Sequence, residues 1–450
     1  MSEKIPASPT KEYFINMMTK DVSIEDSILD LIDNGLDGAR RQIGREKGQA
    51  AILEPSYEGY HVQINFNNSH FSIEDNCGGI ALEAAKNSVF YFGRKADAPR
   101  ETNYSLGVFG IGMKRAFFKL GKNIRIQSST KTEAFSVDID VNRWTENGQW
   151  DLELQREPVW DTPGTRIEIT NLHKNVSREF DTDPVFTNIL KKIIARDYSF
   201  LLHDGFKIIV NSNPVKPYEF KLRESNEFRP LNDHSQNPEL PEVSVKIIAG
   251  LSEFPPDDPY SDEVREPWLN APDYFGWYVV CNGRIVLAAD KSEKTVWGNS
   301  ITSPKWHAQY NGFIGIVSFY SPDPVHLPWT TTRRDLDLTN GVYRRATSTM
   351  KDATWRYIRY TNKRKEDLEG AKELEKKALP KPIGQLPEHT PLTLPRLTNS
   401  PRRKMAEIKY YQPKDLIDKV KEDIGRSFIT NNELGVYSFE YFLDNEVSLD

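Results

Sequence analysis

The 450-residue chain is poor in cysteine and has no long apolar run. Its two cysteines, Cys77 and Cys281, cannot build a disulfide framework and are typical of a reducing compartment. No stretch is apolar enough to cross a bilayer, and the opening MSEKIPASPTKEYF lacks the apolar core of a signal peptide. We therefore expect a soluble, cytoplasmic protein with no membrane partner.

The chain also lacks an excess of positive charge. Lys and Arg number 59 against 65 Asp and Glu, which gives a net charge of −6. This balance argues against nucleic-acid binding by the whole protein surface, but it is compatible with a local basic patch. The sequence shows no metal-ligand cluster, nuclease motif or nucleophilic triad, and its eight histidines are scattered.

The length predicts more than one domain, because single hydrophobic cores stop growing at roughly 250–300 residues. Strand patterns are mixed with helical ones, so we predict an α+β fold. We expect four segments along the chain: residues 1–176, 177–345, 346–404 and 405–450.

Residues 23–40, SIEDSILDLIDNGLDGAR, predict a helix with an apolar face. Asp30, Asn34 and Asp37 follow one another at i, i+4 and i+7 on the opposite face. That face either turns to water or holds a magnesium nucleotide. Gly35 and Gly38 favour the second reading, because a helical glycine costs about 1 kcal/mol relative to alanine and suits a closely approaching phosphate.

A predicted β-hairpin follows, with alternating apolar residues over 62–66 and 71–73. Its second strand ends at Asp75 in the run EDNCGGI. A carboxylate there can accept a hydrogen bond from a ligand edge, while Gly78 and Gly79 let the backbone come close. An ordinary turn with aspartate as the turn former is the alternative.

The stretch SLGVFGIGMKRAFFKLG places Gly107, Gly110 and Gly112 before an apolar helix that Lys114 opens. A glycine-rich turn at a helix N-terminus presents free N–H groups and the positive end of the helix dipole to an anion. The spacing is not that of a P-loop, because the Gly-Lys-Ser/Thr ending is missing. A tight loop for close packing is the alternative.

Further strands are predicted throughout the chain. Those at 124–126, 135–141, 152–154 and 165–169 indicate an antiparallel sheet with helices on one face. The second half predicts a helix over 183–202 and strands at 207–210, 243–248, 274–281 and 313–320. Asn282-Gly283 is a hairpin turn signal.

Taken together, the motifs resemble the GHKL ATPase superfamily of gyrase B, the ninety-kilodalton heat-shock chaperones, histidine kinases, MutL and the MORC proteins. The series reads Asp30-x-x-x-Asn34, Asp75-x-x-Gly78-Gly79, Gly107-x-Phe109-Gly110-x-Gly112-x-Lys114 and Gly164-Thr165. The stretches LDLIDNGLDGA, YFGRKA and GVFGIGMKRA look closest to MORC-like prokaryotic members. The resemblance covers residues 11–340 and implies a Bergerat-type sandwich, in which a mixed sheet lies under helices with ATP between them.

The resemblance also implies roles for individual residues. Asn34 would be the magnesium ligand, and Asp75 would bond the adenine amino group. Gly79 would let the backbone approach the base, and Thr165 would support Asp75 and a water beside the adenine. Contacts to the triphosphate would come from Lys95, Gly107, Phe109, Gly110, Gly112 and Lys114.

Two positions depart from the family pattern. Asp30 stands where the family has a glutamate that polarises the attacking water, and aspartate is one methylene shorter. A base must lie within hydrogen-bond reach of the water, so hydrolysis is expected to be slow while ATP binding survives. Cys77 stands where many relatives have glycine, which we treat as tolerated.

The second half resembles the transducer domain that follows the ATPase domain in gyrase B, MutL and MORC proteins. In those families a basic residue of this domain reaches the γ-phosphate. The run LPWTTTRRDLD places Arg333 there, with Arg334 as the second candidate, although relatives carry lysine. The alternative is a pair of solvated loop charges.

The end of the chain is charged and then proline-rich. A charged helix leads into residues 380–401, which have linker composition. The basic cluster of Arg396, Arg402, Arg403 and Lys404 is either a nucleic-acid contact or a solvated part of that linker. Residues 405–450 predict short helices at 416–424 and 437–443, which we expect to dock on the body or on a partner.

Two hypotheses of function follow. The first is a slowly hydrolysing clamp that binds Mg-ATP, in which ATP orders a lid and drives dimerisation through the N-terminal halves. By family analogy it would serve a DNA-related or defence process, with DNA or a separately encoded protein as partner. The second, motivated by Asp30, is a nucleotide-dependent interaction or scaffold protein without significant turnover.

Overall fold

The structure is a computed structural model that describes residues 9–48, 51, 55–93, 104–107, 110–257, 274–298, 304–330, 332–397, 408–425 and 429–446. The chain forms two compact units, residues 1–398 and 399–450, which we describe separately. Helices and strands alternate through the first unit, so the predicted α+β class is confirmed.

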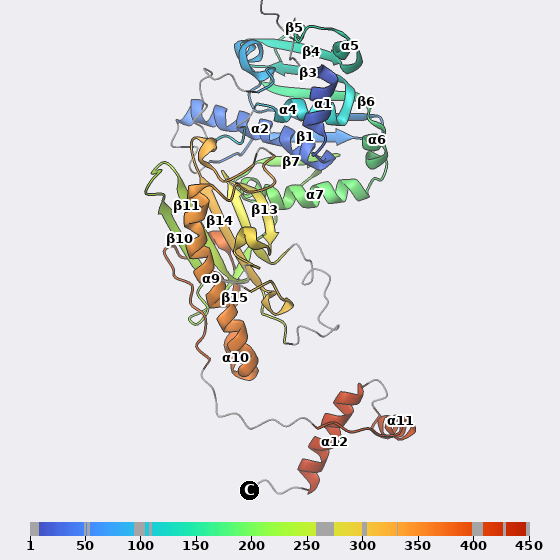
Figure 1. Ribbon diagram of the computed structural model, residues 1–450, viewed down its shortest axis with the longest axis vertical. Helices are drawn as coiled ribbons and strands as arrows, with labels where there is room; N and C mark the ends of the chain where they lie inside the picture. The colour runs from blue at the N-terminus through green and yellow to red at the C-terminus, as the bar shows by residue number, and fades with distance from the viewer. Residues whose placement is uncertain are drawn as a thin grey trace, which may run out of the picture. The chain divides into compact units, whose positions relative to one another are not determined.

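The first unit contains a large mixed sheet, with strand order β5-β4-β3-β6-β2-β1-β7-β8 (Figure 1). All neighbours are antiparallel except β1 and β7, which run parallel. The strands are β1 (His61–Phe66), β2 (His70–Asp75), β3 (Gly121–Ser129), β4 (Ala134–Asp140), β5 (Leu154–Glu157), β6 (Gly164–Leu172), β7 (Lys207–Val210) and β8 (Asn213–Pro214). Strand β7 lies beyond the segment 1–176 in sequence and yet completes this sheet.

Helix α2 (Ile24–Lys47) is the long helix that packs over this sheet. Its N-cap is Ser23, as predicted, whose Oγ accepts a hydrogen bond from the Asp26 N–H at 2.9 Å. A Cβ on Gly35 would lie 2.6 Å from Val62 Cγ2, and one on Gly38 would lie 2.8 Å from the Cys77 carbonyl oxygen. Both glycines therefore allow α2 to pack closely against β1 and the Cys77 turn. The prediction that they make room for a bound phosphate was wrong.

Shorter helices accompany α2 around this sheet. Helices α1 and α4 pack against each other, and α4 also contacts α2, β3 and β6 (Figure 1). The helices of this region are α1 (Lys11–Thr19), α3 (Leu82–Ala84), a π-helical turn (Ala85–Val89), α4 (Gly112–Leu120), α5 (Val141–Glu146), α6 (Lys174–Phe180), α7 (Val185–Asp197) and α8 (Ser199–His203). The single helix predicted over 183–202 is thus two helices, α7 and α8.

A second sheet follows, with order β10-β11-β14-β12-β13. Its strands are β10 (Leu231–Gln236), β11 (Ser244–Leu251), β12 (Gly276–Cys281), β13 (Arg284–Asp290) and β14 (Phe313–Tyr320). The predicted hairpin turn is present: Asn282 has φ +47° and Gly283 has φ +82° between β12 and β13. Helix α9 (Gly341–Glu366) packs on β11 and β14, and α10 (Leu368–Glu375) follows it (Figure 1).

The proline-rich stretch is not a linker over its described residues, 380–397. Strand β15 (Leu379–Pro382) pairs antiparallel with β9 (Lys221–Glu224), and Thr390 pairs with Asn232. Leu386 and Leu392 are buried in the body of the first unit. The linker prediction was wrong here because proline can still offer its carbonyl at a sheet edge, while the leucines supply the apolar surface.

Over its described residues, 408–425 and 429–446, the second unit contains two helices, α11 (Lys414–Asp423) and α12 (Asn431–Glu446). The predicted helix at 416–424 is α11, and the one at 437–443 lies inside the longer α12. Lys421 Nζ donates to Asn431 Oδ1 at 2.8 Å between them. Within the described parts of the whole chain, no helix has the length and apolar character that a membrane span needs.

Candidate functional site

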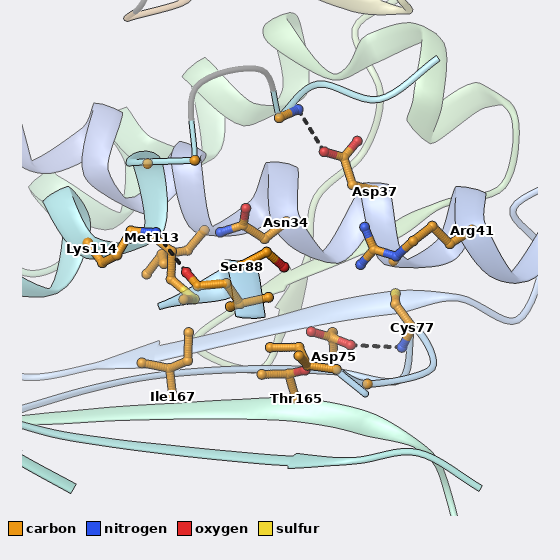
Figure 2. Close-up of a pocket in the computed structure, with 18 of the residues that line it drawn as sticks. Asn34, Asp37, Arg41, Asp75, Cys77, Ser88, Met113, Lys114, Thr165 and Ile167 are labelled. Carbon is orange, nitrogen blue, oxygen red and sulfur yellow. Dashed lines mark hydrogen bonds between the residues drawn. The ribbon is translucent and has the colours of Figure 1, made fainter. Parts of the chain in front are cut away.

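A cavity of about 420 Å³ lies between α2 and the first sheet. Figure 2 shows Asn34 and Arg41 of α2 on one side, and Asp75, Thr165 and Ile167 from the strands on the other. The site residues predicted from sequence that line it are Asn34, Asp75, Gly79, Gly107, Gly110, Gly112, Lys114, Thr165 and Arg333. Lys95 and Phe109 lie outside the described residues.

Asp75 forms the polar end of the strand side. Its Oδ1 accepts a hydrogen bond from the Cys77 N–H at 2.8 Å. Burial raises the pKa of Asp75 to about 6, against the opposing effect of the Cys77 and Thr165 backbone N–H groups. Thr165 Oγ1 lies 3.0 Å from Ser128 Oγ, which holds the two strands together beside the carboxylate. A buried carboxylate that still has acceptor capacity suits a ligand edge that donates hydrogen bonds.

Gly79 closes this end of the cavity by backbone alone. Its φ is +69°, and a Cβ there would lie 2.1 Å from the Ser129 carbonyl oxygen. No side chain fits at this point, because its Cβ would meet the backbone of β3 and β6. The glycine therefore serves the close approach of this turn to the sheet, while its own backbone lines the cavity. Leu31, Val62, Ile73 and Ile167 supply the apolar lining nearby. The pairing of one carboxylate with apolar walls is suited to a heterocyclic base.

Asn34 lies on the α2 side of the cavity (Figure 2). Its Nδ2 is buried and has no hydrogen-bond partner. A buried amide without a partner is costly unless a ligand completes it. Asn34 therefore offers a carboxamide to whatever occupies the cavity.

Asp37, one helical turn later, ties the glycine-rich loop to α2. Its two oxygens accept hydrogen bonds from the Leu106 and Gly107 N–H groups, each at 2.7 Å. Burial raises the pKa of Asp37, and the neighbouring Arg40 opposes the rise. The sequence predicts only that Asp37 belongs to the polar row of α2. The structure shows that Asp37 also anchors the glycine-rich loop.

The start of α4 offers an anion site. No side chain caps this helix, and Gly112 is its first residue, so its first N–H groups have no capping acceptor. Lys114 is buried, and its Nζ donates to the Val89 carbonyl oxygen at 2.7 Å. Burial lowers the pKa of Lys114 to about 8, which leaves it charged at neutral pH.

Asp30 lies next to Gly112 rather than in the cavity lining. Its buried carboxylate is paired with Arg115, whose Nε lies 3.1 Å from Oδ2. Arg333 Nη1 lies 3.8 Å from the other oxygen. Both hydrogen bonds from Arg115 go to Asp30 Oδ2, so Oδ1 keeps its acceptor capacity.

The two candidate arginines are placed differently. Arg333 lines the cavity, and its Nη1 is paired with Asp33. Arg334 is paired with Asp26 and with Asp197, the latter at 2.5 Å. Of the pair, Arg333 is the one in reach of a ligand in the cavity.

Sequence reasoning missed the partners that hold these groups. Asp33, Arg115, Tyr198 and Arg284 are buried polar residues that surround Asp30 and Arg333. The one signal in the sequence was Asp33 itself, an extra acid between Asp30 and Asn34. No sequence motif surrounds Arg115, Tyr198 or Arg284, so their role can be recognised only from the fold.

Comparison with known proteins agrees with this geometry. Residues 22–175 match the family model described as histidine kinase-, DNA gyrase B- and HSP90-like ATPase. No curated protein matches the chain. The matched range contains α2, the Asp75 strand, the glycine-rich loop and Thr165. Residues 22–175 of this chain therefore belong to the GHKL superfamily of ATPases.

Proposed function

We propose that the chain binds Mg-ATP in this cavity and works as a slowly hydrolysing clamp. In this proposal ATP orders a lid and brings the N-terminal halves of two copies together, in the manner of a MORC-like protein. The observation that carries it is convergence: Asn34, Asp75 and Lys114 come from three distant stretches and line one cavity of a GHKL-type domain.

The chemistry of the lining assigns an orientation to ATP. The adenine lies at the Asp75 and Gly79 end, where the carboxylate accepts from the amino group and Gly79 lines the cavity. The phosphates lie along Gly107, Gly110 and Gly112, near the uncapped start of α4 and the Lys114 charge. Arg333 then meets the terminal phosphate.

Magnesium fits this site only together with the nucleotide. Among the described residues, no three His, Cys, Asp or Glu side chains gather into a metal site. Mg²⁺ commonly takes one or two protein oxygens and completes its shell with phosphates and waters. Asn34 lines the cavity, and its side-chain oxygen Oδ1 is the atom that would hold the ion. Its unpartnered Nδ2 is a donor and suits a phosphate oxygen instead. The ion would neutralise charge on the phosphates.

Slow turnover follows from the surroundings of Asp30. The side chain is shorter than the family's glutamate, and its carboxylate is already paired with Arg115. Phosphoryl transfer depends mostly on positioning and on charge neutralisation, so binding persists while activation of the water suffers. The position of Asp30 supports the clamp over a fast enzyme.

Helix α9 supports nucleic acid as the partner of the clamp. It has eight Lys and Arg against two Asp and Glu, in a chain whose net charge is −6. Trp355, with 37% of its surface exposed, interrupts an outward basic stripe of Arg344, Arg345, Arg356, Arg359 and Lys363. The stripe is about 28 Å long. Arg345, Arg356 and Lys363 are paired with Glu239, Asp352 and Glu366, so phosphates would have to replace these surface acids as their partners.

The clamp is tested by two measurements, the rate of ATP hydrolysis and the molecular mass in solution. We would measure steady-state ATP hydrolysis and the molecular mass in solution, with and without a non-hydrolysable ATP analogue, for the wild type and Asn34→Ala. The clamp predicts a monomer that becomes a dimer with the analogue, and an Asn34→Ala variant that does not. If the nucleotide changes neither mass nor thermal stability, the proposal is wrong.

The alternative is a nucleotide-dependent scaffold without significant turnover, which the Asp30–Arg115 pair also favours. Asp30→Glu separates the two. A clamp that hydrolyses gains rate when the longer carboxylate reaches the water. A scaffold keeps its near-zero rate in this variant, while the analogue still drives dimerisation.

A further inference from the structure

Behind Arg333 lies a buried cluster of Asp33, Arg284, Arg333 and Tyr198, none more than 5% exposed. Asp33 Oδ2 accepts from Arg284 Nη1 at 2.7 Å and also from Arg333 Nη1. Asp33 Oδ1 accepts from the Tyr198 hydroxyl at 2.7 Å. One carboxylate of α2 therefore has two guanidinium partners and one hydroxyl donor.

The two arginines of this cluster share one carboxylate. Asp30 is paired with Arg115, and Asp33 is shared by Arg284 and Arg333, while Asp37 and Asp197 lie farther out and also act on these arginines. The Nε atoms of Arg284 and Arg333 are also buried without a hydrogen-bond partner. The site holds more donors than its own acceptors satisfy, so an arriving anion would be favoured.

The two arginines on Asp33 differ in what holds them. Arg284 is the first residue of β13, directly after the Asn282-Gly283 turn, and only 1% of its side chain is exposed. Arg333 lines the cavity and has a left-handed backbone with φ +55°, which an L-residue other than glycine adopts at a cost. Arg284 is therefore the partner that stays on Asp33, and Arg333 is the partner that can turn into the cavity.

We propose that Asp33 and Arg284 are positioning residues for Arg333. Arg284 keeps Asp33 neutralised, so Arg333 can move from Asp33 to the terminal phosphate of a bound nucleoside triphosphate without leaving a buried anion unpaired. The inference rests on the proposed function, because it needs the triphosphate to occupy the cavity. It adds two residues, one of them from the second sheet, that set the preference for triphosphate over diphosphate.

The physical reason is the free-energy cost of a buried charge that has no partner. Removing one partner of a buried pair is strongly destabilising, because the other charge is left uncompensated. Without Arg284, Asp33 would depend on Arg333 alone, and Arg333 would be held away from the phosphate. If Asp33 is then neutralised as well, nothing holds Arg333 back, and the preference should return.

The experiment is an equilibrium titration of the full chain with a Mg-bound non-hydrolysable ATP analogue and with Mg-ADP. The readout is the ratio of the two dissociation constants. We expect Arg284→Met to weaken analogue binding at least tenfold with less than a twofold change for ADP. The double variant Asp33→Asn with Arg284→Met should return the ratio to within threefold of the wild type. Arg333→Ala, the control, should lose the triphosphate preference.

The outcomes separate this inference from the proposed function. If the wild type binds neither nucleotide, or Arg333→Ala keeps the preference, the proposed role of the cavity or of Arg333 fails. If the wild type and Arg333→Ala behave as expected but Arg284→Met keeps the wild-type ratio, the positioning role is overturned. It is also overturned if the double variant stays as weak as Arg284→Met, because a purely structural defect would not be rescued.

A conservative variant guards against misfolding. Tyr198→Phe removes the hydroxyl that donates to Asp33 Oδ1 and keeps the ring in place. Asp33 then depends more on Arg333, so we expect analogue binding to weaken about threefold relative to ADP binding. A folded Tyr198→Phe protein with an unchanged ratio would contradict the proposal even if Arg284→Met cannot be prepared.

Discussion

At the scale of single residues, Asp75 and Lys114 have pKa values that burial shifts toward neutrality from opposite sides. The pKa of Asp75 is raised to about 6, so the ionised form that an adenine amino group needs is lost as the pH falls below 6. The pKa of Lys114 is lowered to about 8, so its charge is lost as the pH rises above 8. We expect ATP affinity to be highest between these values.

The measurement is a series of ATP titrations from pH 5 to pH 9. Affinity should fall about tenfold per unit once the pH lies well below 6. Because its folded pKa is raised, ionised Asp75 destabilises the free protein, and this cost grows as the pH rises from 4 toward 6. Asp75→Asn should bind weakly and lose the acidic limb, and an acidic limb that persists in this variant would assign it to another group.

Gly79 gives a second prediction at this scale. Alanine there would combine a φ of +69° with a Cβ 2.1 Å from the Ser129 carbonyl oxygen. We expect Gly79→Ala to lose about 3 kcal/mol of unfolding free energy and its nucleotide binding. Gly148→Ala is the matched control, because a Cβ there meets nothing within 4 Å. Urea unfolding of both variants checks the prediction, which fails if the two lose similar stability.

At the scale of elements, α9 is the part of the second half whose charge differs most from that of the whole chain. Replacing Arg344 and Arg359 by glutamate should weaken binding to duplex DNA and reduce the slope of log affinity against log salt by about two. Fluorescence anisotropy at several salt concentrations measures both quantities. Lys376→Glu with Lys377→Glu, directly after α10, makes the same charge change on exposed residues elsewhere. If the two pairs behave alike, net charge and not α9 governs binding.

At the scale of the whole molecule, the chain divides after residue 398, close to the end of the proline-rich stretch 380–401, and residues 380–397 belong to the first unit. A chain that ends at Thr398 should keep the stability and nucleotide binding of the first unit. A chain that ends at Lys377 loses β15 and the buried Leu386 and Leu392. We expect it to be less stable by about 4 kcal/mol, at roughly 2 kcal/mol for each buried leucine. Thermal unfolding of both chains tests this, and equal midpoints would refute it.

The sequence by itself determined the parts of the protein that short spacing encodes. The cap at Ser23, the helical row of Asn34 and Asp37, the strand end at Asp75, the glycines before Lys114 and the Asn282-Gly283 turn are all local patterns, and the structure has each of them. Such patterns can be read because a helix or a turn is set by residues a few positions apart.

Only the tertiary structure decided which distant residues meet. Arg284 and Arg333 lie 251 and 300 residues from Asp33, and no local spacing relates them. The same holds for β7, which joins the first sheet, and for β15, which pairs with β9. Long-range ion pairs and strand pairings depend on the whole packed chain, because burial brings these groups together and makes each depend on its partner.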